Sequence, residues 1–215
     1  GMRMYYESIG SGLPIMMIHG RGPDHRSLKG CMEPCFRGDD RTFRRIYFDL
    51  PGLGRTQGNA WVSSGAKMLE LIMDFIERII PKKKFLVVGN SYGGYLARGV
   101  IRNKQDFVQG VLLLCPSSGK KKTQRPPRCT REKDPSLERQ LSDEERSYFE
   151  PVVVRQTHRV WMRFKEEILP GLKIADRPFI KNHWGKDQAA YNFEVELDHP
   201  FENPALILMG KQDSV

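Results

Sequence analysis

The stretch that decides the fold is FLVVGNSYGGYLARG, residues 85–99. Its first half is a short apolar run that predicts a buried strand, and its second half predicts a helix that begins near Gly93. Between them, Ser91 occupies the middle of a Gly-x-Ser-x-Gly pattern. A serine pushed out of a tight turn between strand and helix has strained backbone angles and crowded neighbours, which glycine tolerates best. We therefore interpret Ser91 as a candidate nucleophile, with an ordinary glycine-rich turn as the alternative.

A second glycine-rich turn follows the predicted strand in MMIHGRGPDH, residues 16–25. If a serine attacks an acyl group, two converging backbone N–H groups are needed to hold the tetrahedral oxygen. The amide of Tyr92, at the start of the predicted helix, and the amide of Arg21, helped by Gly22, are the candidates. The alternative is a glycine-rich turn without this role. We expect His19 to hold the loop by hydrogen bonds rather than to transfer protons.

The third stretch is YFDLPGLGRT, residues 47–56. In this order and with these separations, the three stretches resemble the α/β-hydrolase superfamily, whose pattern has a His-Gly turn, an Asp-x-Pro-Gly-x-Gly turn and a serine turn after successive strands. The resemblance covers residues 2 to about 115 and resumes at Pro204. It implies a serine nucleophile and a capped fold. We expect Asp49 to fix its loop beside the pocket rather than to react.

The order of the elements predicts an α/β fold, a three-layer α/β/α sandwich with a mostly parallel sheet. Near-continuous apolar strands of this kind need helices on both faces. The segment between the last two predicted strands is far longer than one βα unit needs, so it holds an insertion. We expect residues 1–115 and 196–215 to form the hydrolase-like core and residues 116–195 to form a helical cap. The candidates for an apolar underside of that cap are Trp161, Phe164, Trp184 and Tyr191, although helical spacing favours core packing for the first two.

The sequence GKQD, residues 210–213, matches the Gly-x-x-Asp turn that the resemblance implies after the seventh strand. Asp213 would then be the acid that orients the catalytic histidine. The alternative is a turn aspartate that caps a following helix. In the family the histidine lies beyond this turn, after one more strand, and the printed sequence holds no such segment. We therefore expect a truncated chain whose activity is impaired.

The chain has five histidines. Apart from His19, which is expected to hold its loop, four of them could replace the catalytic base that the family places after the last strand. His199 precedes the last strand, so the length of that strand separates it from the catalytic edge. His25, His158 and His183 stay as minor candidates, because each is more often a surface or packing residue. The last strand would also be left as an uncovered edge, so we expect self-association through residues 205–209.

The function that these residues favour is a serine hydrolase that acts on a small carboxylic ester or related acyl substrate. The alternatives are a non-catalytic ligand-binding relative, or a fragment of a longer active enzyme. If the Arg21 side chain lines the pocket, its guanidinium would attract an anionic or carboxylate-bearing substrate; otherwise it is an exposed loop arginine. We expect no cofactor and no metal, because Cys31 and Cys35 have no second pair to complete a site.

Charge, hydropathy and cysteine content indicate which kinds of partner and which compartment to expect. The net charge is +9, but the basic residues are dispersed and lack the interleaved aromatic residues that stack on bases, so we expect no nucleic-acid partner. No apolar run approaches the length of a membrane-spanning helix, so we expect no membrane partner. The chain has four cysteines and no secretory signal at its start, which favours the cytoplasm and free thiols.

Overall fold

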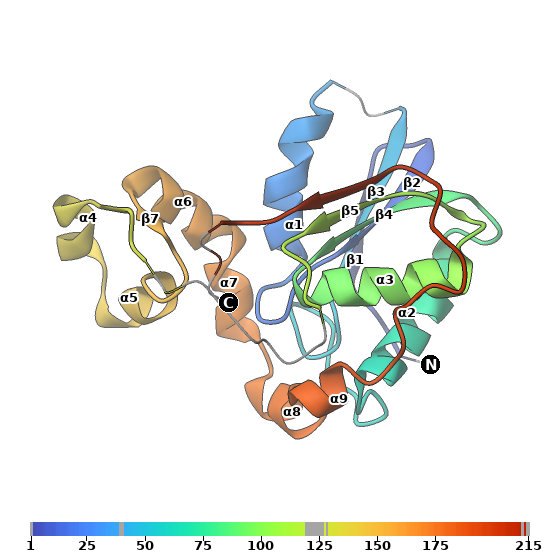
Figure 1. Cartoon of the computed structure of the whole chain (residues 1–215). Coiled ribbons are helices and arrows are strands. Elements are labelled where there is room, and N and C mark those ends of the chain that lie inside the picture. Colours follow the sequence, from blue (N-terminus) through green and yellow to red (C-terminus); the bar gives the residue numbers. More distant parts are fainter. Residues whose placement is uncertain (1, 39–40, 119–126, 128, 212, 214–215) are drawn as a thin grey trace.

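The computed structural model describes residues 2–38, 41–118, 127, 129–211 and 213. Its centre is a six-stranded sheet (Figure 1) with the order β1-β3-β2-β4-β5-β8. The first strand runs antiparallel to β3, and every other pairing in this sheet is parallel. The strands are β1 (Tyr6–Ile9), β2 (Leu13–Ile18), β3 (Phe43–Phe48), β4 (Phe85–Asn90), β5 (Val108–Leu114) and β8 (Ala205–Leu208).

Helices cover both faces of this sheet. On one face lies α1 (His25–Met32), followed by the short 3-10 helix η1 (Glu33–Phe36); on the other lie α2 (Gly65–Ile79) and α3 (Tyr92–Lys104). Alternate residues of β2 point to opposite faces. Met16 therefore packs with α2 and α3, whereas Met17 packs with α1. These layers confirm the predicted three-layer α/β fold with a mostly parallel sheet.

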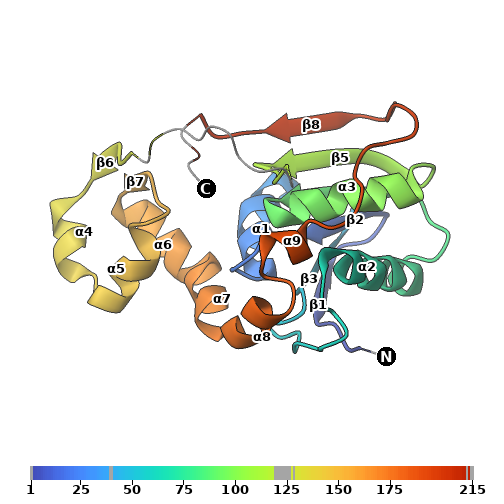
Figure 2. The ribbon, with the colours of Figure 1, turned by 60° about the horizontal axis from the view of Figure 1, so that its bottom comes forward.

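A lobe of short helices projects from the carboxyl ends of the strands (Figures 1 and 2). It has an apolar cluster of its own, separate from the two clusters that flank the sheet. Residues of this cluster include Phe149, Trp161 and Phe164, whose rings pack within about 6 Å of one another. The elements of the lobe are β6 (Glu132–Lys133), α4 (Pro135–Gln140), α5 (Asp143–Phe149), β7 (Arg155–Gln156), α6 (His158–Glu167) and α7 (Leu169–Ile174).

After the lobe the chain returns to the sheet through α8 (Arg177–Asn182) and α9 (Asp187–Ala190). Between these two helices Trp184 is completely buried in the main core. Its ring stacks on Tyr92 with 5.4 Å between ring centroids and 15° between ring planes. The segment after the lobe is therefore part of the packing around the first turn of α3. How residues 116–195 divide between cap and core stays a prediction.

The last strand forms an exposed edge of the sheet, as Figure 2 shows. Ile207 is 56% exposed and Met209 is 74% exposed, although both are large and apolar. The predicted exposure of residues 205–209 is therefore present, while self-association through this edge stays a prediction. Among the described residues, no helix combines the length and the apolar character needed to cross a bilayer.

Candidate active site

Ser91 lies in the turn between β4 and α3, where sequence analysis placed it. It is the N-cap residue of α3 and has φ 52° and ψ −118°, outside the regions that non-glycine residues normally occupy. Its backbone is held by four hydrogen bonds, one of which is a longer bond of 3.4 Å from Tyr95 N to its carbonyl oxygen. Its N–H donates to Leu114 O over 3.0 Å, and its carbonyl accepts from Gly94 N and from Ser117 N over 2.9 Å each. The surrounding bonds keep this strained residue in place.

Close packing explains the glycines on both sides of Ser91. A Cβ atom on Gly93 would clash with the carbonyl oxygens of Ile18 and His19 at the end of β2. A Cβ atom on Gly89 would lie 2.5 Å from Gly93 O, which is closer than real Cβ atoms approach. The strand and the helix can therefore meet this tightly only without side chains at these positions. The prediction that the Gly-x-Ser-x-Gly pattern forms a sharp strand-to-helix turn is confirmed.

The loop after β2 lies directly against this turn. A Cβ atom on Gly20 would lie 3.2 Å from the Cβ atom of Ser91, so the loop backbone passes the serine side chain closely. Arg21 and Gly22 follow immediately, and Gly22 has φ 118°. Tyr92 is the first residue of α3, so its N–H has no acceptor within the helix. The structure thus places the loop that carries Arg21 and Gly22 close to Ser91, and Tyr92 follows Ser91 in the chain.

His19 ties the loop after β2 to the end of β3. Its Nδ1 lies 2.7 Å from Gly20 O, and its Nε2 lies 3.0 Å from Leu50 N. Because a carbonyl only accepts and an amide only donates, Nδ1 carries the proton and Nε2 accepts, which describes a neutral ring. Burial lowers the pKa of His19 and so favours the same state. The expectation that His19 holds the loop by hydrogen bonds is confirmed.

Asp49 anchors the start of α1. Its Oδ1 accepts from His25 N over 2.9 Å and from His25 Nδ1 over 2.7 Å, and its Oδ2 accepts from Arg55 N over 2.9 Å. His25 Nε2 also lies 3.1 Å from Glu7 Oε1, so both ring nitrogens face carboxylates. Burial opposes charge on His25, but these hydrogen bonds outweigh it and raise its pKa. Asp49 therefore has the structural role that the sequence predicts.

Asp24, His25 and Asp49 bring potential metal ligands together, since one ligand atom from each lies within 4.8 Å of the others. All three residues are buried. The atoms already have partners, however. His25 and Asp49 bond each other, and Asp24 accepts from the Arg26 side chain and caps α1. This donor set is satisfied by protein hydrogen bonds, so we interpret it as structural.

Asp213 lies after β8, at the same carboxyl edge of the sheet as Ser91. Its N–H donates to Gly210 O over 3.2 Å, which closes the turn that the sequence predicts. Burial raises the pKa of the Cys115 thiol, and a hydrogen bond with the Asp213 side chain raises it further. Cys115 directly follows Leu114, whose carbonyl accepts from Ser91 N. Two adjacent residues at the end of β5 therefore link the two candidates: Leu114 bonds Ser91, and Cys115 bonds Asp213.

Among the described residues, no histidine ring hydrogen-bonds to the Ser91 hydroxyl. The rings of His19 and His25 are engaged as described above. His158 lies in the lobe, with Nε2 3.1 Å from Ser136 Oγ, and the ring of His183 packs against that of Phe179. His25 is not a ready partner of Ser91, because both of its ring nitrogens have other partners, and His158 Nε2 is likewise engaged within the lobe.

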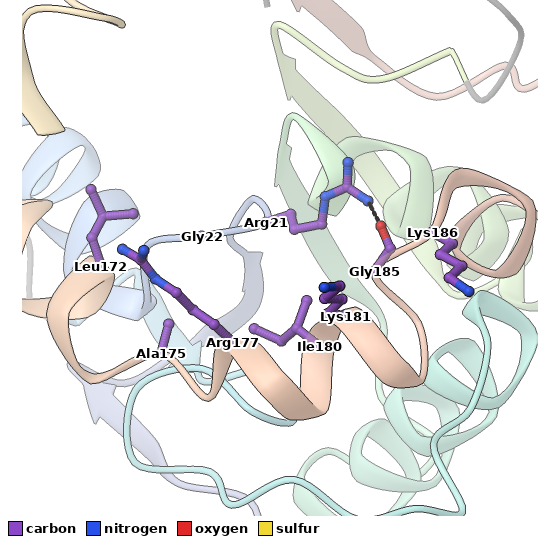
Figure 3. A pocket seen from close by; sticks show the side chains of 9 residues that line it. All are labelled: Arg21, Gly22, Leu172, Ala175, Arg177, Ile180, Lys181, Gly185 and Lys186. Carbon is purple, nitrogen blue, oxygen red and sulfur yellow. Dashed lines mark hydrogen bonds between the residues drawn. The ribbon is translucent and has the colours of Figure 1, made fainter. Parts of the chain in front are cut away.

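A cavity of about 350 Å³ opens next to the loop after β2 (Figure 3). Arg21 lines it, and its Nη1 donates to Gly185 O over 2.6 Å across the cavity's edge. Arg21 thus combines the two alternatives that the sequence left open, because it lines this cavity and is also an exposed loop residue. Sequence reasoning missed the cationic residues on the far side of this cavity, although Arg177 and Lys181 stand four residues apart in one helix. The lining residues are Arg21, Gly22, Leu172, Ala175, Arg177, Ile180, Lys181, Gly185 and Lys186.

Comparison with known proteins agrees with this fold. Residues 14–196 match the family described as the alpha/beta hydrolase fold, so the chain belongs to this family. Over 114 residues it is 28% identical to 2-hydroxy-6-oxo-6-(2'-aminophenyl)hexa-2,4-dienoic acid hydrolase of Metapseudomonas resinovorans. That alignment covers 53% of this chain but 39% of the relative, so the match spans about two fifths of that protein's length.

Solved structures give a fuller match. An alpha/beta superfamily hydrolase from Oenococcus oeni PSU-1 aligns with a TM-score of 0.85 and 28% identity, over 99% of this chain and 78% of that one. An esterase from Exiguobacterium antarcticum aligns with a TM-score of 0.69 and 17% identity, over 100% of this chain and 80% of that one. At this lower identity the esterase supports the fold alone. The resemblance stated from the three sequence motifs is thereby confirmed at the level of the superfamily.

Proposed function

We propose that the chain is a serine hydrolase of the α/β type that acts on a small carboxylic ester or related acyl substrate. The observation that carries this proposal is the backbone of Ser91, which has a positive φ at the N-terminus of α3 with Gly20 packed against its side chain. Strain of this kind persists where the neighbouring structure holds it, and it clusters at functional sites. The named relatives, which include a dienoic acid hydrolase, are consistent with such chemistry.

In this mechanism Ser91 Oγ attacks the acyl carbon while a base takes its proton, which gives a tetrahedral intermediate. The backbone amides of Tyr92 and Arg21, helped by Gly22, would hold the oxyanion, and the N-terminal end of the α3 dipole would favour the same negative charge. Collapse releases the alcohol and leaves an acyl-serine, which water then hydrolyses. Asp213 would orient a histidine and stabilise its charged form.

A second candidate is a ligand-binding protein that keeps the pocket without the chemistry. It is favoured by one observation: within the described residues, no histidine ring contacts the Ser91 hydroxyl through a hydrogen bond. Removing the base of a triad costs several orders of magnitude in rate, although assistance from the oxyanion hole survives. The two candidates therefore predict different responses to a supplied base.

The test combines a covalent probe with a supplied base. A fluorophosphonate should label the chain at Ser91 and should not label Ser91→Ala. Added imidazole should raise the rates of labelling and of ester hydrolysis by about tenfold, because a general base contributes about 10²- to 10⁴-fold when it is well placed. Ligand binding without labelling or turnover, with and without imidazole, would exclude the hydrolase and support the binding protein.

A further inference from the structure

We propose that the cavity beside Ser91 recognises a carboxylate on the substrate, so that the preferred substrates are short-chain acyl compounds with a terminal anionic group. The recognition residues are Arg177, Lys181 and Lys186, which line the cavity together with Arg21 (Figure 3). The location of an anion site follows from the cavity itself. Its assignment to the substrate rests on the serine hydrolase proposed above.

The cavity shares its walls with the candidate catalytic turn. One wall is formed by Arg21 and Gly22, which follow Gly20, the residue packed against Ser91. The opposite wall includes Gly185, which follows Trp184, and the Trp184 ring stacks on Tyr92. Each wall therefore directly follows a residue of the candidate site: Gly20, which lies against Ser91, precedes one wall, and Trp184, which stacks on Tyr92, precedes the other. A ligand in the cavity would lie next to the proposed oxyanion hole.

The charge of the cavity is positive. Arg177 and Lys181 stand on the same side of α8, one turn apart, and Lys186 follows on the next segment. The partner of Arg177 is neutral: its Nη2 donates to Tyr148 Oη over 2.7 Å, and its guanidinium lies 5.3 Å from the Tyr148 ring centroid. In the described part of the chain, no carboxylate forms an ion pair with these three cations. Their charges are thus available to an anionic ligand.

The remaining walls suit a short hydrocarbon chain. Leu172, Ala175 and Ile180 line the cavity with apolar side chains, and Figure 3 shows Ile180 between Arg177 and Lys181. Charged groups at the rim combined with apolar walls favour an amphipathic ligand. A volume of about 350 Å³ lies at the small end of the range for ligand pockets. These properties fit a small monoester of a dicarboxylic acid better than a neutral ester.

The test measures binding separately from turnover. In the full chain with Ser91→Ala, calorimetry compares monomethyl glutarate with dimethyl glutarate, which differs by masking the carboxylate. We expect the monoester to bind at least about tenfold more tightly, because hydrogen bonds between charged groups are stronger than those to a neutral ester. The preference should fall as salt rises, because salt screens these exposed charges. Equal affinities for the two esters would overturn the inference.

Matched variants locate the site. The double variant Arg177→Gln with Lys181→Gln should reduce the preference for the monoester to about twofold or less, whereas Lys84→Gln, at the amino end of β4, should leave it unchanged. Both replaced cations are exposed, so a thermal melt close to that of the parent is expected. A preference that survives the double variant would overturn the assignment to this cavity.

Turnover then separates this inference from the proposed function. In the chain with Ser91 intact, kcat/KM for the two esters should show the same preference as binding. Selective binding of the monoester without hydrolysis of either ester would overturn the hydrolase and support the anion site. Equal hydrolysis of both esters would support the hydrolase and overturn the anion site.

Discussion

Asp49→Asn offers a sharp test of how the loop beside Ser91 is held. The substitution keeps the Oδ1 atom that accepts from His25, but it places an NH₂ group where Oδ2 accepts from Arg55 N. A buried donor then faces another donor, and the charged His25 loses its main counterion. A lost hydrogen bond to a charged group, together with an unpaired buried group, costs about 3–4 kcal/mol. This is a large share of a typical free energy of unfolding, about 5–15 kcal/mol.

Urea denaturation measures this loss. With a slope of about 3 kcal/mol/M, the midpoint should fall by about 1 M relative to the parent chain. The control is Asp74→Asn, because Asp74 is exposed on α2 and the same chemical change there should cost little. The loop that carries Arg21 should also loosen, so fluorophosphonate labelling of the folded variant should slow. A midpoint shift as small as that of the control would refute this account of Asp49.

The loss should also depend on pH in a defined direction. Burial opposes the charge on Asp49, but hydrogen bonds from His25 and Arg55 hold its pKa below the usual value. Its contribution is therefore present above about pH 3.9 and is lost as pH falls through the folded pKa. The pKa of His25 is raised, so its contribution is present below about pH 6.5 and is lost as pH rises through its folded pKa. The cost of Asp49→Asn should thus be largest near pH 5.5 and shrink towards pH 9. A cost that grows over this range would contradict the charged pair.

Two further substitutions test the serine turn and the exposed strand. Gly93→Ala should destabilise the chain by about 3 kcal/mol or more and abolish fluorophosphonate labelling, because the added Cβ meets backbone oxygens that cannot move aside. Gly38→Ala, where a Cβ meets nothing within 4 Å and the cost is limited to the strain of a φ of 83°, should keep labelling, and wild-type labelling of Gly93→Ala would contradict the packing argument. We also predict that the parent chain self-associates through β8 and that Ile207→Lys shifts it towards monomer in analytical ultracentrifugation. Ile174→Lys, equally exposed in α7, is its control; an unchanged mass distribution for Ile207→Lys would exclude this interface.

Features that depend on local spacing could be predicted from the sequence. The turn at Ser91 follows from glycines two residues away on either side, because the tight approach of strand and helix requires them there. The structural roles of His19 and Asp49 follow in the same way, since each stands at the end of a strand and bonds backbone groups of the adjoining loops. The contacts of these residues are with backbone groups at the ends of neighbouring strands, and the sequence pattern already indicates where those strands end.

Features that depend on the path of the chain after the lobe could not be predicted. The stacking of Trp184 on Tyr92 joins residues far apart in the sequence, and it depends on how α8 and α9 return to the sheet. The cationic side of the cavity was missed for the same reason. In the sequence, Arg177 and Lys181 have the pattern of a solvent-exposed face of a short helix. In the structure they line the same cavity as Gly22. No local pattern signals which surface a helix of six residues will face.

The separate apolar cluster of the lobe has a consequence for engineering this scaffold. Leu137, Phe149, Trp161 and Leu169 bury one another without help from the sheet, whereas Trp184 belongs to the main core. A graft that exchanges roughly the segment from α4 to α7 would move this cluster together and would replace Leu172 in the cavity wall, while Arg21, Gly22 and Gly185 stay in place. The module also rests on α1, where Arg163 Nη2 of α6 donates to Gly30 O over 3.1 Å, so a donor segment must reproduce this contact to leave the loop beside Ser91 undisturbed.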